Sequence, residues 1–365
     1  MAKSRNYYSV LIALLALPLL FDFSAISRAM SAHRYGELAT TPPVHAGAAS
    51  VAETRLTSER SASAASSVSY EIANPYAVPG VFRKTQFHLH SHPHDGRKEF
   101  TPERTAHTFK RDGYGFVMYT DHDQATQFTG QNDDTFATAT GYESTGDGGH
   151  IGAWFMDTVI DPGLPAQRRI DAIRQAGGIA ALNHPDWPVG FTAEQLKELE
   201  GYLALEIYNH ITTLRPEQLR GNLEKWRQVL NQKGPRQPVW GIAVSDTHEA
   251  FTGGGWTLVK TETVSAAALR EAIVRGSMYG TTGPELRTIE VVDGKIVVEA
   301  AVGEGALGAE ISRIRFIDQN GRTVHEAVAG RASYQPTDRD RWVRIEASDS
   351  KGRTAWSQPL WITHG

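Results

Sequence analysis

The chain has 365 residues, of which 40% are apolar and 21% charged, proportions that are usual for a soluble protein with a hydrophobic core. Its formal net charge is −4 and no stretch is strongly basic, which argues against a nucleic-acid-binding surface. The sequence contains no cysteine, which excludes disulfides, thiolate nucleophiles and cysteine-ligated zinc sites. Any metal ion must therefore be held by His, Asp and Glu, a ligand set that suits Zn, Mn or Fe.

The N-terminus has the pattern of an export signal. Lys3 and Arg5 precede an apolar run, Val10–Leu20, that is too short for a membrane span of about 20 residues. Small residues follow it, where a signal peptidase could cleave. We therefore predict a signal peptide over residues 1–32 and an exported protein, periplasmic or secreted, that meets a membrane only through this signal. An uncleaved signal anchor is the alternative.

Residues 33–75 are predicted to form a flexible linker. The stretch is rich in Ala, Ser and Thr up to Ser69 and shows no apolar periodicity. Periodic structure begins near Val81.

Between residues 76 and 283, short apolar runs alternate with helical patterns. The predicted strands are Thr85–His90, Gly115–Thr120, Ile151–Phe155, Gly178–Asn183, Leu203–Tyr208 and Val239–Ser245. The predicted helices are Pro102–Asp112, Ala166–Ala176, Thr192–Leu199, Pro216–Asn231 and Ser265–Arg275. Strands that alternate with helices of this length indicate βαβ units and a mainly parallel sheet, either open or closed into a barrel.

Polar residues stand where four of these strands end. The strand ends run into His90, Asp121-His122, Asn183-His184 and Asp246-Thr247-His248. Catalytic groups of α/β barrels collect at the carboxyl ends of the strands, because those ends share one face. We therefore expect these side chains to meet.

Residues 284–365 alternate apolar and polar positions and are predicted to form a small antiparallel β domain. The strand candidates are Thr288–Val292, Lys295–Val302, Ile311–Ile317, Trp342–Ala347 and Leu360–Thr363. Asp293-Gly294 and Asn320-Gly321 are typical of hairpin turns. We interpret the two histidines of this region, His325 and His364, as surface residues.

The candidate metal ligands begin with His88 and His90, which would point to the same side of a strand and could chelate one ion. The further candidates follow in chain order: His122, Glu143, His150, His184, Asp246 and His248. A purely structural role would require a core with six histidines and several carboxylates that lack partners. Such groups are costly to bury unless they are paired or bind a metal. We therefore interpret the series as a metal centre.

This ordered series resembles that of the PHP superfamily of metallohydrolases, and most closely its CehA/McbA-like branch, over about Val81 to Gly283. The segment Arg353–Trp361 also resembles the terminal β segment of that branch. The resemblance implies a distorted (β/α)7 barrel of PHP type, followed by the small antiparallel β domain. It also implies two or three divalent metal ions at the strand ends.

Carried over to this chain, the resemblance implies three overlapping ligand sets. They are His88, His90, Glu143 and Asp246 for a first ion, a bridging Glu143 with His150 and His184 for a second, and Asp95, His122 and His248 for a third. The branch usually has Ser before the Asp-Gly pair, whereas this chain has His94. Either His94 or Asp95 can therefore be the ligand, and we favour Asp95.

Other polar and aromatic residues could shape the site. The candidates for substrate binding are His92, His94, Arg97 and His210, with a solvated surface role as the alternative. Asp121 and Asn183 could orient ligand histidines or cap turns. Trp154, Trp187 and Trp256 could form an apolar or sugar-stacking wall, although packing in the core is the commoner fate of tryptophan.

Divalent ions at such a site lower the pKa of bound water, which supplies hydroxide near neutral pH. Asp246 is the candidate base, and His248 is a neighbouring histidine that could protonate the leaving group. We predict a phosphoesterase that acts on a small-molecule phosphodiester or phosphomonoester, with no nucleic-acid partner. A carbamate or carboxylic ester hydrolase on the same metal site is one alternative. A non-catalytic metal-dependent binding protein is another.

Overall fold

The computed structural model describes residues 70–91, 99–249, 251–303 and 307–365. All of them belong to one compact unit, Ser66–Gly365. The predicted signal peptide, most of the predicted linker, and His92, His94, Asp95 and Arg97 lie outside the described residues. No helix in the described part of the chain has both the length and the apolar character that crossing a membrane requires.

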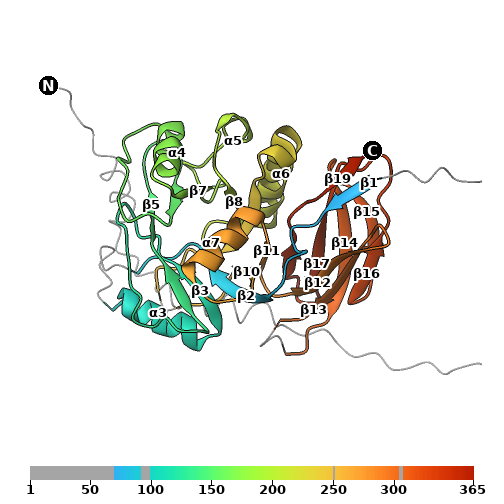
Figure 1. Cartoon of the computed structure of the whole chain (residues 1–365), viewed down its shortest axis with the longest axis horizontal. Coiled ribbons are helices and arrows are strands. Elements are labelled where there is room, and N and C mark those ends of the chain that lie inside the picture. Colours follow the sequence, from blue (N-terminus) through green and yellow to red (C-terminus); the bar gives the residue numbers. More distant parts are fainter. Residues whose placement is uncertain (1–69, 92–98, 250, 304–306) are drawn as a thin grey trace, which may run out of the picture. The chain divides into compact units, whose positions relative to one another are not determined.

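The described residues form a mixed α/β structure that is rich in strands (Figure 1). The helices are α3 (Pro102–Arg111), α4 (Ala166–Gln175), α5 (Ala193–Glu198), α6 (Pro216–Lys233), the 3₁₀ helix η2 (Gly234–Arg236) and α7 (Ala266–Arg275). The first strands are β1 (Tyr70–Ala73), β2 (Val81–Gln86), β3 (Tyr114–Met118), β4 (Ala137–Ala139), β5 (Gly141–Ser144), β6 (Ile151–Trp154), β7 (Ile179–Leu182), β8 (Ala204–Asn209), β9 (Trp240–Val244), β10 (Trp256–Thr261) and β11 (Met278–Thr281). The strands that follow are β12 (Glu285–Val292), β13 (Lys295–Ala301), β14 (Ile311–Asp318), β15 (Thr323–Ala327), β16 (Arg331–Tyr334), β17 (Trp342–Asp349), β18 (Thr354–Trp356) and β19 (Leu360–His364).

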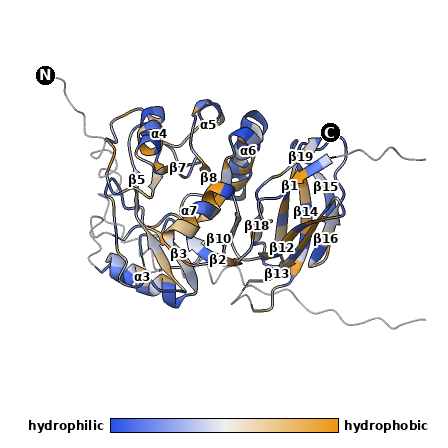
Figure 2. Cartoon of the chain, in the orientation of Figure 1, coloured by the Kyte–Doolittle hydropathy of each residue, from blue (hydrophilic) through white to orange (hydrophobic). Residues whose placement is uncertain are grey.

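Three of these helices, α3, α5 and α7, begin where a hydroxyl side chain caps them. Thr101 accepts a hydrogen bond from the Arg104 backbone amide at 3.2 Å, Thr192 forms a capping box with Gln195, and Ser265 accepts from Ala268. Each hydroxyl satisfies an amide of the first turn that has no partner within the helix. In Figure 2, α4 and α7 carry both hydrophilic and hydrophobic segments, as expected for helices with one buried face.

The predicted mainly parallel sheet is only partly correct. The order β5-β6-β7-β8-β9 makes a five-stranded sheet, in which β7, β8 and β9 are parallel but β5, β6 and β7 pair antiparallel. The connection between β5 and β6, residues 145–150, is too short for a parallel crossover of a dozen residues or more. A second sheet contains the parallel neighbours β2, β3 and β4.

Isolated bridges join these two sheets near the ends of their strands. Leu89 pairs with Thr247, and His122 pairs with Glu143. The strand predicted over Thr85–His90 is wrong at its end, because β2 stops at Gln86 and the histidine pair follows it. These bridges hold the strand ends next to one another, whereas the closed (β/α)7 barrel stays a prediction.

The C-terminal strands pair antiparallel, as predicted, but they do not form a separate sheet throughout. The 11-stranded sheet runs β1-β19-β17-β18-β11-β10-β2-β3-β4, with β14 and β15 attached through β17, so it crosses the predicted boundary between residues 283 and 284. The predicted linker also ends too late, because its residues 70–73 form β1 and pair with β19. At the hairpin between β12 and β13, Asp293 and Gly294 have φ angles of 49° and 74°, which suits a two-residue turn.

A buried glutamine connects the C-terminal segment to β9, the strand that leads to Asp246. The Gln358 side chain donates to the Gly241 carbonyl at 2.8 Å and accepts from the Gly241 amide at 2.9 Å. The Trp226 indole donates at 2.8 Å to the carbonyl of Val239, the residue just before β9. Helix α6 and the C-terminal segment therefore both fix the position of β9.

Candidate metal centre

The side chain of Glu143, in β5, lies at the centre of a group of histidines and is 1% exposed. Each of its two carboxylate oxygens contacts imidazole nitrogens from several strand ends. The contacts are His150 Nδ1 (3.1 Å) and His184 Nε2 (3.0 Å) for Oε1, and His88 Nε2 (3.3 Å), His90 Nε2 (3.6 Å) and His122 Nε2 (3.0 Å) for Oε2. The five histidines come from the ends of β2, β3 and β7 and from the start of β6. Five of the six predicted histidine ligands thus meet around one buried carboxylate.

Asp246, which follows β9, provides a second buried carboxylate. Its Oδ1 lies 3.3 Å from His88 Nε2 and 3.1 Å from His90 Nε2, and its Oδ2 accepts a hydrogen bond from Asn209 at 3.0 Å. The two histidine Nε2 atoms are 3.2 Å apart. The histidine pair therefore lies between the carboxylates of Glu143 and Asp246.

His248 lies at the more open edge of the group, with its side chain 29% exposed. Its ring stacks on His90 with centroids 4.0 Å apart, and Nδ1 lies 3.1 Å from the Asp246 backbone carbonyl. Since a carbonyl only accepts, Nδ1 donates there, and Nε2 is the nitrogen with a lone pair for a cation.

Two residues of the group have unusual backbone conformations. His184 has a φ of 23° and Asp246 a φ of 52°, in a region that residues with a Cβ seldom adopt. The His184 amide donates to Glu206 Oε2 at 2.7 Å, and the Asp246 amide donates to the His88 carbonyl at 3.0 Å. Strain of this kind concentrates at functional sites, where surrounding contacts hold it in place.

Glu206 is a positioning residue that the sequence analysis missed. It is 1% exposed in β8, and its Oε1 accepts from His88 Nδ1 at 2.6 Å. Its Oε2 also accepts from Asn209 at 2.9 Å. Because Nδ1 of His88 donates in this contact, Nε2 is the nitrogen that faces Glu143 and Asp246, where a metal ion could take the place of its proton. The available signal was a charged residue inside an otherwise apolar strand, Ala204–Asn209.

Gln86 is a second missed residue, at the last position of β2. Its Oε1 accepts from the amides of His88 at 3.3 Å and Ser245 at 3.1 Å. Its Nε2 donates to the Gly255 carbonyl at 3.1 Å. One buried amide side chain therefore ties the backbone of the histidine pair to that of the segment before Asp246.

Buried carboxylates hold His88 toward its protonated form. Burial alone would lower the pKa of His88, but the charges of Asp246, Glu143 and Glu206 raise it well above 6.5. Burial alone would raise the pKa of Glu143. The charge of His88 and hydrogen bonds from three further histidines instead hold the pKa of Glu143 well below 4.5. Glu143 is therefore ionised and attracts positive charge.

His184 and His90 show opposite shifts. Burial alone would lower the pKa of His184, but the hydrogen bond and charge of Glu143 raise it to about 9. Burial and the neighbouring ring of His248 lower the pKa of His90 to about 4. A neutral imidazole packed among charged groups is the form that binds a metal ion.

The donor atoms fit divalent cations. Four groups of three ligand atoms lie within 4.8 Å of one another: His88, His90 and Glu143; His88, His184 and Asp246; His122, Glu143 and His150; and His90, His122 and His248. The buried Nδ1 atoms of His90 and His184 have no hydrogen-bond partner in the described part of the chain. The polar contacts of these two rings are therefore made through their Nε2 atoms, with Asp246 for His90 and with Glu143 for His184. Nitrogen and carboxylate donors of this kind suit Zn, Mn or Fe.

The other candidates have different surroundings. Asn183 donates to Glu143 Oε1 at 2.9 Å, so it contacts the central carboxylate of the group. Asp121 accepts from the amide and hydroxyl of Ser91, at 2.6 and 3.0 Å, and so holds the residue after His90. The predicted roles of Asp246 and His248 in catalysis stay predictions.

His210, Trp154 and Trp187 lie in three different surroundings. His210 stacks on Phe251 at 5.3 Å and joins none of the four groups of ligand atoms found in the described residues. Trp154 is buried and stacks on Phe87 at 4.7 Å, so it takes the core position that was the alternative to a substrate wall. Trp187, by contrast, is 43% exposed and lies 6.2 Å from the ring of His184.

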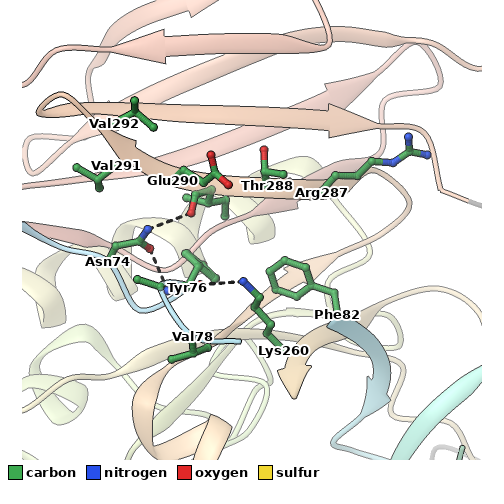
Figure 3. Close-up of a pocket in the computed structure, with 12 residues that line it drawn as sticks. Asn74, Tyr76, Val78, Phe82, Lys260, Arg287, Thr288, Glu290, Val291 and Val292 are labelled. Carbon is green, nitrogen blue, oxygen red and sulfur yellow. Dashed lines mark hydrogen bonds between the residues drawn. The ribbon is translucent and has the colours of Figure 1, made fainter. Parts of the chain in front are cut away.

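A pocket of about 350 Å³ lies away from these residues, between the segment after β1 and strand β12 (Figure 3). Lys260 donates to the Tyr76 carbonyl at 3.0 Å, and Asn74 donates to the Ile289 carbonyl at 3.0 Å. These two polar side chains are thus engaged with backbone, and none of the candidate ligands lines the pocket.

No protein-family model and no curated protein sequence matches the chain. Among solved structures, it is similar to a two-domain protein from Bacteroides vulgatus that contains a predicted PHP-like metal-dependent phosphoesterase. That match has 15% identity and a TM-score of 0.42, and it covers 79% of this chain and 92% of the other. It is also similar to PsfC from Pseudomonas syringae, with 12% identity, a TM-score of 0.40 and coverage of 53% and 88%. Similarities of this size establish neither a shared family nor a shared activity.

Proposed function

We propose that the chain is a metal-dependent hydrolase of the PHP class that cleaves phosphodiesters or phosphomonoesters of small molecules. The observation that carries the proposal is Glu143, a buried carboxylate with five imidazole nitrogens within 3.6 Å of its oxygens. A carboxylate that bridges metal ions shares those ions with further ligands, and imidazole nitrogens gathered around both of its oxygens are donors that such ions accept.

The residues that would hold the ions are those of the four overlapping groups, with Asp95 as a further candidate. Divalent ions bound there supply Lewis-acid stabilisation of the ester oxygens and lower the pKa of water. Overlapping groups favour more than one ion, and a phosphate can offer an oxygen to each. This is the reason to prefer a phosphate ester over a carbamate or carboxylic ester.

The residues of the chain itself would position the substrate and move protons. Asp246, fixed by Asn209 through Oδ2, is the candidate base. His248 is partly exposed and lies beside Asp246. When no ion occupies its Nε2, that nitrogen is placed to protonate a leaving oxygen. We also propose export, which the basic residues Lys3 and Arg5 before the apolar run support.

The proposal is tested by metal content and turnover on the same purified protein. Metal content is measured by mass spectrometry, and hydrolysis is followed with bis(p-nitrophenyl) phosphate, p-nitrophenyl phosphate and p-nitrophenyl acetate before and after chelation. The variants His88→Ala and Asp246→Ala are compared with Val328→Ala, which alters an 82% exposed residue outside the group.

We expect two or three ions per chain, and phosphate-ester turnover that chelation abolishes and that both site variants lose. Preference for the acetate ester would replace the phosphoesterase assignment by a carboxylic ester hydrolase. Metal binding without any turnover would indicate a binding protein. Protein that cannot be loaded with Mn, Fe or Zn would overturn the proposal.

A further inference from the structure

Four large apolar residues are exposed on the two loops that follow β7 and β8. They are Trp187 (43% exposed), Val189 (56%), Ile211 (40%) and Leu214 (64%), and we refer to them as the apolar rim. The same strand ends carry His184 and Asn209, which contact Glu143 and Asp246. Exposed apolar groups gathered beside a polar centre mark a surface that a ligand covers.

The rim is continuous with the metal centre. The Trp187 ring lies 6.2 Å from the ring of His184, at an interplanar angle of 67°. Asn209 donates to Asp246 through its side-chain nitrogen, while its side-chain oxygen accepts from the amide of Ile211 at 3.0 Å. A molecule whose reacting group lies among the histidines would therefore extend across these loops.

The backbone of the loop after β7 is fixed by hydrogen bonds although its apolar side chains are exposed. The Trp187 amide donates to the His184 carbonyl at 2.9 Å, and the Gly190 amide donates to the Trp187 carbonyl at 2.7 Å. Lys225 fixes the same loop by donating to the Pro185 carbonyl at 2.5 Å. A side chain presented on a fixed backbone loses little conformational entropy when a ligand contacts it.

A hydrogen bond joins the two loops. The Thr212 hydroxyl donates to Asp186 Oδ1 at 3.2 Å, so the segment with Trp187 and Val189 stays beside the one with Ile211 and Leu214. The rim can therefore act as one surface rather than as two independent loops.

We propose that the apolar rim binds the aromatic or long alkyl group of the ester and that the enzyme prefers substrates with such a group next to the phosphate. This inference rests on the proposed function, because it places the phosphate at the histidine group. The indole of Trp187 offers a flat face for an aryl ring, which supplies both apolar burial and stacking.

The test compares two phosphodiesters with the same leaving group, bis(p-nitrophenyl) phosphate and methyl p-nitrophenyl phosphate. The measured quantity is the ratio of their kcat/KM values on Mn-loaded protein, since this ratio cancels losses common to both esters. We expect Trp187→Ala to lower the aryl preference by about tenfold, and Leu214→Ala by less. Trp187→Phe should retain most of it, and Val328→Ala should not change it.

A second pair of probes does not need turnover. The affinities of phenylphosphonate and methylphosphonate for the Mn-loaded protein are measured by calorimetry in the wild type and in Trp187→Ala. One possible outcome is that neither ester is hydrolysed, phenylphosphonate binds more tightly than methylphosphonate, and Trp187→Ala removes this difference in affinity. That outcome would support the rim proposal and contradict the proposed activity. An aryl preference that is absent, or that Trp187→Ala leaves unchanged in both assays, overturns the rim proposal.

Discussion

The C-terminal strands and the histidine group both contain buried carboxylates, but these have different partners. In the C-terminal region Glu346 is 5% exposed and forms ion pairs with Arg344, at 2.5 Å, and with Arg315. At the strand ends Glu143 is 1% exposed, and all its charged partners are histidines. An arginine always carries its positive charge, whereas a histidine carries one only when it is protonated.

This difference separates a structural from a functional carboxylate. Arginine does not lose its charge in proteins, so the ionised Glu346 has its positive partners within the chain. The imidazoles around Glu143 carry lone pairs that a proton or a metal ion can occupy, so their charge depends on what the solution supplies. The histidine group should therefore respond to metal ions, and the ion pairs of Glu346 should not.

Glu143→Gln should have the largest effect. A neutral amide cannot bridge cations, and its nitrogen would face imidazoles that need an acceptor or an ion. We expect bound metal to fall by at least one ion per chain and phosphate-ester turnover to fall below about a thousandth of the wild-type value. Metal analysis and kcat/KM measure both quantities, and Glu346→Gln is the matched control, which should keep its metal.

Glu346→Gln should instead lower the free energy of unfolding, by about 3 kcal/mol, because two arginines lose a buried partner. Burial would raise the pKa of Glu346, but the arginines hold it below its ordinary value of 4.5. A carboxylate with a lowered pKa stabilises the fold above its unfolded pKa, and this contribution is lost as the pH falls through the folded value. Urea unfolding between pH 7 and pH 3 should therefore show a weaker pH dependence in the variant, and an unaltered dependence would contradict this role.

Glu206→Gln should have an intermediate effect on the histidine group. The side chain no longer fixes the proton on His88 Nδ1, so the lone pair of Nε2 is no longer reliably directed at the carboxylates. Loss of a residue that orients a metal ligand costs about 10–100-fold in metal affinity or activity. Titration with Mn should recover part of the activity at high metal concentration, a recovery that Glu143→Gln should not show.

The elements that the sequence predicted correctly are those whose ends carry local signals. Thr101, Thr192 and Ser265 cap their helices, so α3, α5 and α7 begin within a residue of the predicted starts. The meeting of the histidines could also be predicted, because polar residues at the ends of neighbouring strands share one face.

What the sequence could not show depends on distant partners. Residues 70–73 form a strand only because β19 offers an edge almost three hundred positions away, and nothing in the local composition indicates this. Gln86 and Glu206 were missed for the same reason, since a single polar residue in a buried strand acquires its role from residues on other strands. The antiparallel pairing of β6 with β7 likewise follows from the tertiary arrangement and not from the apolar pattern.

Gln358→Leu should have the smallest effect and tests how far the two regions depend on each other. The change leaves the buried amide and carbonyl of Gly241 without their partner, which should lower the free energy of unfolding by about 1–3 kcal/mol. Because β9 leads to Asp246, a shift of this strand would also lower the affinity for Mn, and calorimetric titration with Mn measures that. A loss of stability with unchanged Mn affinity would show that Gln86 and the bridge between Leu89 and Thr247 hold the end of β9 by themselves. The C-terminal segment would then support the fold without shaping the metal centre.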